Sequence, residues 1–537
     1  MALLNENMKN LKHIFIAIIS FGFSLSFVQA QNFDFGEEKV NLFTDRTLFI
    51  TGEEINFNAY LDNVSNQSKA LYIELILADG TSLVSQKHSI VNKNCRGKLV
   101  IPHDIVSGTY YIKAYTKYMR NFGAEFFSYS PLKIVNPNSL EFLSGEGIKV
   151  LDSVTITDVI HNKSLDETNI KIQLTAEAVQ DLKNFIVSIV PAHSFQVSKF
   201  KNNSNSINRQ KYYPETRGLS VTGLLVDSLS QQPIPFKEVT LSIIEQKNFL
   251  PTLTRADGKF YFALPDLTGN HDLFISTKKE ESYRPLILVD KDYDTESISL
   301  PNPPFSLSKS ERLAALKLAQ AFQISANYFK SKTIHNFDTF RIPFYGHAKS
   351  ILYLDKYISM ATLEEYFTEL PGIVHIKNQN KVKSFVISSP LRDMSFYRPL
   401  VLMDMVAVED INRILAVSPI GVEKVEIIPH PYVYGSIIYG GIISIRSREG
   451  DFGGISLPKT GLFFNFDFLE AQNDQKPVAA SQSPDCRNTL FWESFSSVSE
   501  LPLEIEFQKE SSNEIYWLII QGLDANKNIE RKVYVVN

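Results

Sequence analysis

The chain has 537 residues, of which 44% are hydrophobic and 21% charged, and its formal net charge is −5 at pH 7. This is the composition of a globular protein, and at roughly 150 residues per domain it predicts three to five domains. The negative charge, without a cluster of Lys and Arg, excludes a protein that mainly binds nucleic acid. Cys95 and Cys486 are too few for a disulfide framework, so either one bridge or two unbonded thiols remain open.

Residues 1–30 have the order of a secretory signal peptide. Lys9 and Lys12 precede an apolar run over 14–27, and small residues follow up to Ala30. A retained anchor is the alternative, but the run is shorter and more polar than the about 20 apolar residues of a spanning helix. We therefore expect secretion across the inner membrane, cleavage after Ala30 and a mature protein that does not itself span the membrane.

Residues 31–137 show the two-residue period of β-strands. Apolar side chains recur at alternate positions over 55–61, 73–77 and 110–114, which predicts strands with one buried face. Glycines at 52, 80, 97 and 108 supply turns between them. About 100 residues of short alternating strands predict a β-sandwich.

The same β pattern continues, more weakly, over 138–215 and again over 216–300. We expect a second and a third β-sandwich there. In the third, Asp257 and Gly258 predict a tight hairpin before the strand 260–263.

Residues 301–350 predict a helical linker. Ser308 and Glu311 form a capping box, in which each side chain satisfies an otherwise unpaired amide at the helix start. We expect the helix to dock on a neighbouring domain through one face. The residues at helical spacing on that face are Leu313, Leu316, Gln320 and Ile324.

Residues 351–453 predict a small α/β domain. Thr362 is expected to cap a helix over 363–370, and Asp410 a short helix that Pro419 ends. The expected strands that follow the first helix are 373–376, 383–387, 400–404, 422–428 and 442–448. The remainder, 454–537, predicts a C-terminal β segment that either forms a small sandwich or completes an earlier one.

The stretch Arg398–Gly453 resembles the plug domain of TonB-dependent outer-membrane receptors. The resemblance rests on motifs in order: Pro-Leu-Val-Leu-Met-Asp at 399–404, Val-Glu-Lys-Val-Glu-Ile-Ile at 422–428, Tyr-Gly at 434–435, Tyr-Gly-Gly-Ile-Ile-Ser-Ile-Arg-Ser at 439–447 and Arg-Glu-Gly at 448–450. In such plugs a glycine usually follows the aspartate, whereas this chain has Met405. The resemblance implies a gram-negative envelope protein of the periplasm, outer membrane or cell surface.

Plugs normally sit inside a barrel, but only 84 residues follow Gly453. Receptors of this kind have about 22 strands, and each strand takes about 9–11 residues. More than about 200 residues would be needed, so we expect a plug-like domain without the receptor barrel.

Two further resemblances concern the β domains. Thr44-Asp45-Arg46, Thr51-Gly52-Glu53 and Ser107-Gly108-Thr109-Tyr110 resemble a macroglobulin-type domain of the α2-macroglobulin superfamily. Neither cysteine lies in the Cys-Gly-Glu-Gln motif of that superfamily's reactive thioester. Val221-Thr222-Gly223 and the run 254–260 resemble the carboxypeptidase regulatory-like domain, which in that family is a structural β-sandwich.

No motif predicts catalysis, a cofactor or a metal site. His-Glu-x-x-His, Gly-x-Ser-x-Gly, Cys-x-x-Cys and phosphate-binding glycine loops do not occur. His88 and His103 flank Cys95, but their spacing fits no common zinc pattern. The acidic residues 404, 409 and 410 suggest a carboxylate cluster, with a helix cap as the simpler interpretation of the last.

We therefore expect a mostly β, multidomain and non-enzymatic envelope protein that binds or scaffolds a protein partner, such as an outer-membrane β-barrel, as an accessory of TonB-dependent uptake. The loop residues Tyr432, Val433 and Tyr434 are the candidate partner-binding site, because tyrosines are favoured at interfaces. The alternative is a surface adhesin or glycan-binding protein that uses the aromatic residues between 110 and 129; an α2-macroglobulin-like inhibitor fits less well.

Overall fold

The computed structural model describes residues 36–62, 68–160, 163–164, 169–179, 182–198, 200, 211–280, 282–328, 342–370, 372–379, 382–388, 396–471, 487–495, 502–508 and 514–536. The expected signal peptide and Cys486 lie outside these ranges, and Cys95 is a buried free thiol. Within the same ranges, none of the helices has both the length and the apolar composition needed to cross a bilayer.

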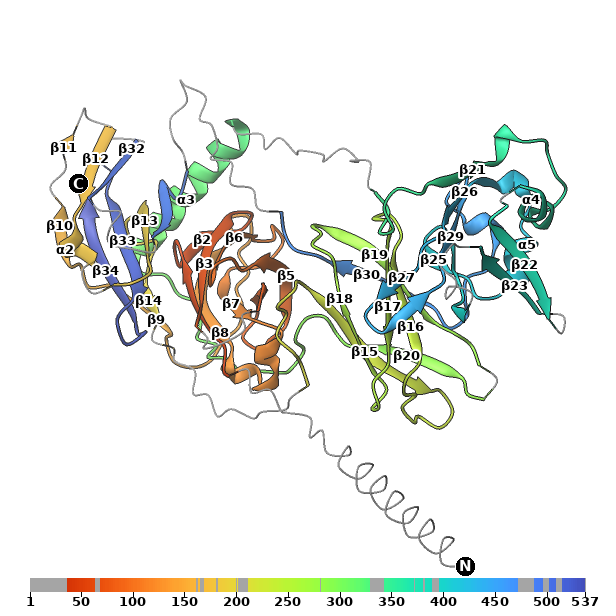
Figure 1. Cartoon of the computed structure of the whole chain (residues 1–537). Helices are drawn as coiled ribbons and strands as arrows, with labels where there is room; N and C mark the ends of the chain where they lie inside the picture. Colours follow the sequence, from red (N-terminus) through yellow and green to blue (C-terminus); the bar gives the residue numbers. More distant parts are fainter. Residues whose placement is uncertain are drawn as a thin grey trace, which may run out of the picture.

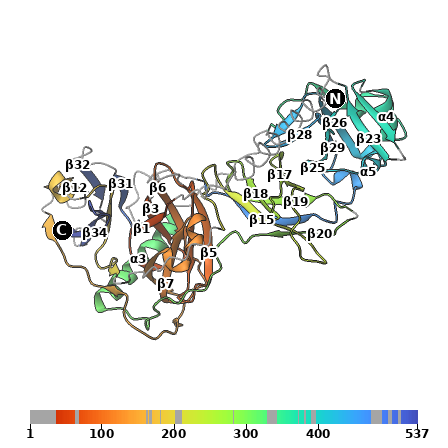
Figure 2. The same cartoon turned by 60° about the horizontal axis from the view of Figure 1, so that its bottom comes forward.

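The protein is mostly β, and its strands form four units along an elongated molecule (Figures 1 and 2). We call them sandwich A (36–137), sandwich B (151–198 with 487–536), sandwich C (219–289 with 462–469) and the α/β unit (344–455). Their order in space is B, A, C and the α/β unit, which differs from their order along the chain. The prediction of successive sandwiches with a small α/β domain is confirmed.

Sandwich A consists of two facing sheets with strand orders β1-β3-β6 and β2-β8-β7-β4-β5. Its strands are β1 Lys39–Thr44, β2 Leu48–Ile50, β3 Glu54–Asp62, β4 Ala70–Ile76, β5 Ser82–Ser89, β6 Asn94–Val100, β7 Gly108–Tyr115 and β8 Ser128–Val135. All pairings are antiparallel except that of β2 with β8. Ile55, Phe57 and Ala59 are buried in the core, as their alternation predicted.

Strand β7 departs from the prediction of one buried face, because every one of its residues is buried. Tyr111 donates a hydrogen bond to the carbonyl of Pro301, and Lys113 lies 3.2 Å from Asp294. The segment 290–301, which follows sandwich C in the chain, therefore contacts the face that the sequence predicted to be exposed.

Sandwich B combines two distant parts of the chain. Its sheets have the orders β10-β34-β33-β13-β31 and β11-β12-β32. The elements are β9 Leu151–Asp152, β10 Asp158–Ile160, β11 Lys163–Ser164, β12 Asn169–Leu174, α2 Ala176–Val179, β13 Phe185–Pro191, β14 Val197–Ser198, β31 Phe491–Phe495, β32 Leu503–Gln508, β33 Tyr516–Leu523 and β34 Ile529–Val536. Of the two possibilities left open for the C-terminal segment, completing an earlier domain is the one observed.

Sandwich C has the sheets β18-β15-β20 and β17-β16-β19-β30. Its strands are β15 Ser220–Asp227, β16 Glu238–Ile243, β17 Asn248–Leu253, β18 Lys259–Ala263, β19 Asn270–Thr277, β20 Pro285–Val289 and β30 Leu462–Asp467. The expected turn is present, with φ of 75° at Gly258. The prediction of a hairpin was wrong, because the strands that flank this turn, β17 and β18, belong to different sheets.

Helix α3, Lys309–Tyr328, begins with the predicted capping box. The backbone N–H of Glu311 donates to Ser308 Oγ at 3.3 Å, and the N–H of Ser308 donates to Glu311 Oε2 at 2.7 Å. This reciprocal pair satisfies two amides that a helix start would otherwise leave without partners.

The helix docks on β2 of sandwich A, but with a different face from the predicted one. Leu313 and Leu316 are each 56% exposed. The docked face consists of Ala314, Ala315, Leu318 and Ala319, which pack with Leu48 and Ile50. The small side chains of the alanines let the helix backbone approach the strand closely. The prediction was wrong because it assigned the docked face to the larger residues Leu313 and Leu316.

The α/β unit has a sheet of order β21-β26-β29-β24-β25, in which β24 and β29 are parallel. Its elements are β21 Ser350–Tyr353, α4 Leu363–Glu369, β22 Val374–Gln379, β23 Val382–Ile387, β24 Leu400–Met403, β25 Val406–Ala407, α5 Ile411–Leu415, β26 Val422–Ile428, β27 Tyr432–Tyr434, β28 Ile437–Tyr439 and β29 Ile442–Ser447. Thr362 caps α4 and Asp410 caps α5, as predicted. Apolar residues of both helices share a core with the sheet and the β22–β23 hairpin.

Candidate functional site

The turn between β24 and β25 is the point where the plug resemblance expects a glycine. Asp404 and Met405 have φ of 45° and 71° there, values that L-residues adopt rarely and glycine adopts without strain. Met405 is nevertheless completely buried. Met405 therefore has an unfavourable backbone conformation, and its side chain is buried.

The carboxylate of Asp404 holds this turn in place. It accepts hydrogen bonds from the N–H of Ser447 at 2.9 Å, from Ser447 Oγ at 2.5 Å and from the N–H of Phe452 at 2.9 Å. Glu409 forms an ion pair elsewhere, and Asp410 caps α5. The three acidic residues thus have separate structural roles and do not form the carboxylate cluster that the sequence suggested.

The buried methionine contacts sandwich C. Met405 belongs to an apolar cluster with Leu400, Leu402 and Ile442 of the α/β unit and Phe249 of β17. Phe249 has no exposed surface. The ring of Phe249 is thus fully buried at the boundary between the two units.

Polar groups surround this apolar contact. Arg398 lies 2.5 Å from Glu238 of sandwich C and 3.1 Å from Glu409, and Tyr439 donates a 2.5 Å hydrogen bond to Glu238. Lys278 of sandwich C lies 3.3 Å from Glu409. Half-exposed pairs of this kind contribute little stability individually, but they connect the two units around the apolar contact.

The predicted partner-binding residues lie on the β27–β28 hairpin. The ring of Tyr432 packs edge-on against Phe344 at 5.2 Å and stacks on Tyr439 at 6.3 Å. Tyr434 is partly buried against the core that sandwiches A and C share, whereas Val433 is 59% exposed. Both tyrosines thus make contacts within the molecule, and a partner-binding role for the three residues stays a prediction.

A different part of the α/β unit exposes large apolar side chains. Ile358 is 87% exposed and Ile420 is 81% exposed. Arg448 brings their segments together, because its guanidinium donates to the carbonyl of Ile420 at 2.8 Å and pairs with Asp355 at 2.5 Å. We call Tyr357, Ile358 and Ile420 the exposed isoleucine patch.

Sandwiches A and C are joined through buried charges. Lys113 of β7 lies 3.1 Å from Glu74 and 3.2 Å from Asp294, and Arg120 lies 3.7 Å from the same aspartate. Tyr115 donates to Glu74 at 2.8 Å and accepts from the N–H of Asp294 at 2.8 Å. Burial raises the pKa of Asp294, although the two cations work in the opposite direction.

A second buried cluster lies at the start of sandwich C. Glu215 accepts hydrogen bonds from the N–H of Ser220 at 2.7 Å and from Tyr72 at 3.2 Å, and lies 3.7 Å from Lys117. Lys117 also donates to the carbonyl of Ser220 at 2.6 Å. Burial raises the pKa of Glu215, while Lys117 acts to lower it.

Lys87 completes this junction and has no exposed surface. It pairs with Asp292, donates to the carbonyl of Asp467 and lies 3.7 Å from the centre of the Phe466 ring. Phe466 belongs to β30, so one lysine of sandwich A contacts the strand that returns to sandwich C. Burial lowers the pKa of this lysine.

The macroglobulin-type motif lies at the junction between sandwiches A and B. Arg46 pairs with Glu53 at 3.1 Å, and both side chains are buried. Asn488 donates to Glu53 at 2.5 Å, and Thr489 donates to Asp45 at 2.5 Å. The motif residues therefore bind the segment that precedes β31.

The histidines and the cysteine flagged by the sequence have packing roles. His88 packs edge-on against Phe57 at 4.9 Å, and burial lowers its pKa to about 4. His103 lies 6.5 Å from Phe322 of α3, and Cys95 is buried. Among the described residues, His, Cys, Asp and Glu do not form a group of three that could hold a metal ion.

The aromatic residues between 110 and 129 are mostly inaccessible. Those that are buried are Tyr110, Tyr111, Tyr115, Tyr118, Phe122 and Phe127. The rings of Tyr115 and Phe127 stack at 4.4 Å, and Tyr115 also stacks on Tyr72 at 5.4 Å. These rings serve packing and cross-strand pairing and do not present a glycan-binding surface.

Sequence reasoning missed the buried charges at the junctions. Lys113 stands between Tyr111 and Tyr115 on the face of β7 that was expected to be solvated. Two aromatic neighbours on a supposedly solvated face are the signal that could have indicated a covered lysine.

A scan against protein-family models finds no match for this chain, and a search of the curated proteins finds none either. Solved structures similar to it include a Salmonella α2-macroglobulin reacted with methylamine, at 9% identity and a TM-score of 0.16, and an Escherichia coli α2-macroglobulin activated by porcine elastase, at 9% and 0.21. These matches cover 94% and 93% of this chain but 23% and 44% of the macroglobulin chains. A CARDB domain from Pyrococcus furiosus matches 20% of this chain over 98% of its own length, at 12% identity and a TM-score of 0.15. This chain spans less than half the length of the two macroglobulin chains.

Proposed function

We propose that this chain is a non-enzymatic scaffold of the gram-negative cell envelope that presents its α/β unit to a protein partner. The partner is proposed to be an outer-membrane component of TonB-dependent uptake, because 398–453 resembles a receptor plug in sequence. The chain would then be an accessory of that uptake system and not a transporter itself.

The exposed isoleucine patch is the observation that supports partner binding. Ile358 and Ile420 are both more than four-fifths exposed. Arg448 holds their segments together by contacts to Asp355 and to the backbone. Exposed apolar groups on a fixed framework are typical of protein–protein contacts.

The junctions support a scaffold role. Charged side chains such as Lys113, Glu215 and Lys87 are buried where the units meet, and each is paired with a residue from another part of the chain. Breaking a buried pair leaves an uncompensated charge, so the units resist separation. A rigid series of sandwiches would hold the α/β unit at a set distance from sandwich B.

The test is purification of the tagged full-length chain from gently solubilised envelopes of its own source, with mass spectrometry of the proteins that remain bound. We expect a stoichiometric outer-membrane uptake protein with the wild type. The double variant Ile358→Asp/Ile420→Asp should lose it. The matched control is Leu229→Asp, at a residue of sandwich C that is 71% exposed.

Two outcomes would contradict the proposal. A chain that is recovered alone in the soluble fraction has no such partner. Equal capture by the wild type and by the double variant would show that the exposed isoleucine patch is not the contact.

A further inference from the structure

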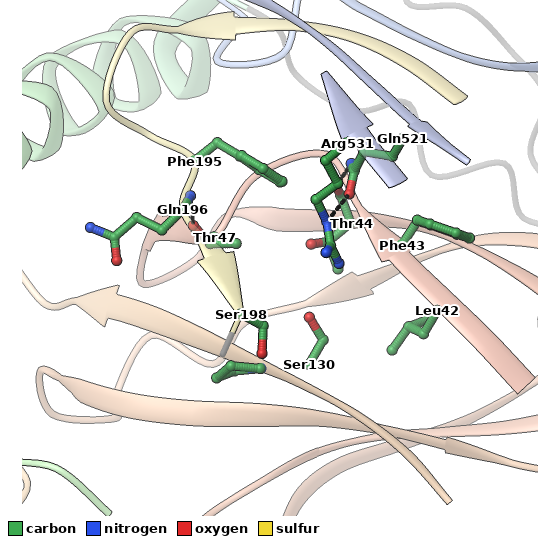
Figure 3. A pocket seen from close by; sticks show the side chains of 11 residues that line it. Leu42, Phe43, Thr44, Thr47, Ser130, Phe195, Gln196, Ser198, Gln521 and Arg531 are labelled. Carbon is green, nitrogen blue, oxygen red and sulfur yellow. Dashed lines mark hydrogen bonds between the residues drawn. The ribbon is translucent and has the colours of Figure 1, made fainter. Parts of the chain in front are cut away.

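A small cavity lies between sandwiches A and B, and Arg531 of β34 reaches into it (Figure 3). The space inside it is small and opens to solvent. Strands β1 and β8 line it from sandwich A, and β14, β33 and β34 line it from sandwich B. The polar side chains of the lining are Thr44, Thr47, Ser130, Gln196, Ser198 and Gln521.

The guanidinium of Arg531 is held at one nitrogen only. Its Nε donates to Gln521 Oε1 at 3.3 Å, and Gln521 in turn donates to the carbonyl of Thr44 at 2.8 Å. Gln521 is therefore fixed between the two sandwiches. Across the described ranges, the two terminal nitrogens of Arg531 make no hydrogen bond or ion pair with the protein, which leaves their N–H donors available.

Arg531 is partly exposed, and its arrangement differs from that of the buried cations. Arg46 lies 3.1 Å from Glu53, and Lys133 lies 2.6 Å from Glu311. For Arg531 burial is the single influence on the pKa, which it lowers to about 10. A cation that is partly withdrawn from water and has no nearby carboxylate is unfavourable, so a negative group that binds in the cavity would offset that penalty.

We propose that this cavity is a binding site for a small oxyanion, a carboxylate or a phosphate, held by the fork of Arg531. A planar guanidinium donates two parallel hydrogen bonds to such groups. Ser198 Oγ already accepts from the N–H of Phe200 at 3.2 Å, so its O–H is free to donate, and Ser130 adds a second hydroxyl. The bound anion links sandwich A to sandwich B.

The binding test is isothermal titration calorimetry of the full-length chain with sodium phosphate, sodium acetate and sodium chloride at equal ionic strength. We expect phosphate or acetate to bind with one site per chain and chloride not to bind. Binding by phosphate alone or by acetate alone identifies the class of oxyanion. Indistinguishable titrations with all three salts would overturn the proposal.

Variants locate the site. Arg531→Gln should weaken binding at least tenfold, and Arg531→Lys should weaken it less. Lys98→Gln removes a cation of sandwich A that is 54% exposed and paired with Glu54, and it should leave binding unchanged. Unaltered binding in Arg531→Gln would place the anion elsewhere and contradict the proposal.

A stability measurement distinguishes anion binding from a purely structural role of the arginine. Saturating phosphate or acetate should raise the urea concentration at which the wild type unfolds, and it should not raise that of Arg531→Met, which also lacks the hydrogen bond to Gln521 with or without the anion. An equal rise in the two chains would mean that the anion binds elsewhere, and the proposal would fail.

Discussion

Ser242 Oγ of sandwich C donates a 2.9 Å hydrogen bond to the main-chain carbonyl of Met405 in the α/β unit. The strained turn and the contact between the two units are thus the same feature. Met405→Ala should loosen the attachment of the α/β unit by about 2–4 kcal/mol, since a buried methionine leaves a cavity when truncated. Hydrogen exchange of β16 and β24 would measure this. Ile438→Ala, at a partly exposed residue of the nearby hairpin, is the control and should have little effect.

Glu215 and Lys117 form a pair whose disruption should be asymmetric. Glu215→Gln leaves the lysine buried without its carboxylate, and we expect a loss of about 3 kcal/mol in the stability of the contact between sandwiches A and C. The double variant Glu215→Gln/Lys117→Met should recover most of that loss. Denaturant titrations of the four chains form a double-mutant cycle. Additive effects would show that the pair is not coupled.

His88 should make sandwich A sensitive to mild acid. Burial lowers its pKa from 6.5 to about 4, so the unfolded chain binds more protons than the native chain between these values. Stability that is complete above about pH 6.5 is therefore lost as the pH falls towards 4, by about 3 kcal/mol. Urea titrations at pH 7 and pH 5 would measure the change. His88→Leu should remove this part of it, and His430→Leu, at an exposed residue, should not.

Glu311 should make the contact between α3 and sandwich A less stable in acid. Burial acts to raise its pKa, but hydrogen bonds from Lys133 and Ser308 outweigh burial and lower it below 4.5. The stability it contributes is present above pH 4.5 and is lost as the pH falls through the lowered value. Glu311→Gln at pH 7 should loosen α3 by about 1–3 kcal/mol, measured by hydrogen exchange along the helix. Glu449→Gln, at an exposed residue, should have no such effect.

Changes in side-chain size on the two faces of α3 test which face contacts β2. Ala315→Leu should overpack the contact with β2 and destabilise it by about 1–3 kcal/mol. Leu316→Ala, on the exposed face of the same helix, should change stability by less than about 0.5 kcal/mol. Thermal unfolding of the two variants compares them directly. The reverse ranking would mean that the leucines form the docked face after all.

Local signals in the sequence predicted local structure well. The caps at Thr362, Ser308 and Asp410 were correct, because a cap depends on residues two or three positions away. The strands of sandwich A were also predicted correctly, because the alternation of apolar and polar residues is a local pattern. The faces of β7 and α3 were wrong, since what covers them comes from elsewhere in the chain.

The partner-binding role of Tyr432, Val433 and Tyr434 stays a prediction, and sequence reasoning reached fewer of the contacts around the candidate site than of the fold. Tyr432 and Tyr434 were expected in an exposed loop, yet they pack against other parts of the molecule. The exposed isoleucine patch was not anticipated, because Ile358 and Ile420 carry no periodic pattern. Ion pairs such as that of Lys113 with Asp294 join residues far apart in the chain, and no local pattern indicates them.

The strands β31 to β34 determine when sandwich B can fold, because they lie far along the chain from the rest of that sandwich. Strand β13 pairs on both sides with strands from much later in the chain, Phe185 with Phe495 on one side and with Gly522 on the other. The apolar strand β13 therefore stays uncovered during synthesis until the chain has been extended beyond Gly522. Sandwich B therefore exposes apolar surface, which chaperones can bind, for longer than sandwich A does. A chain whose synthesis stops early would contain β13 without its neighbouring strands.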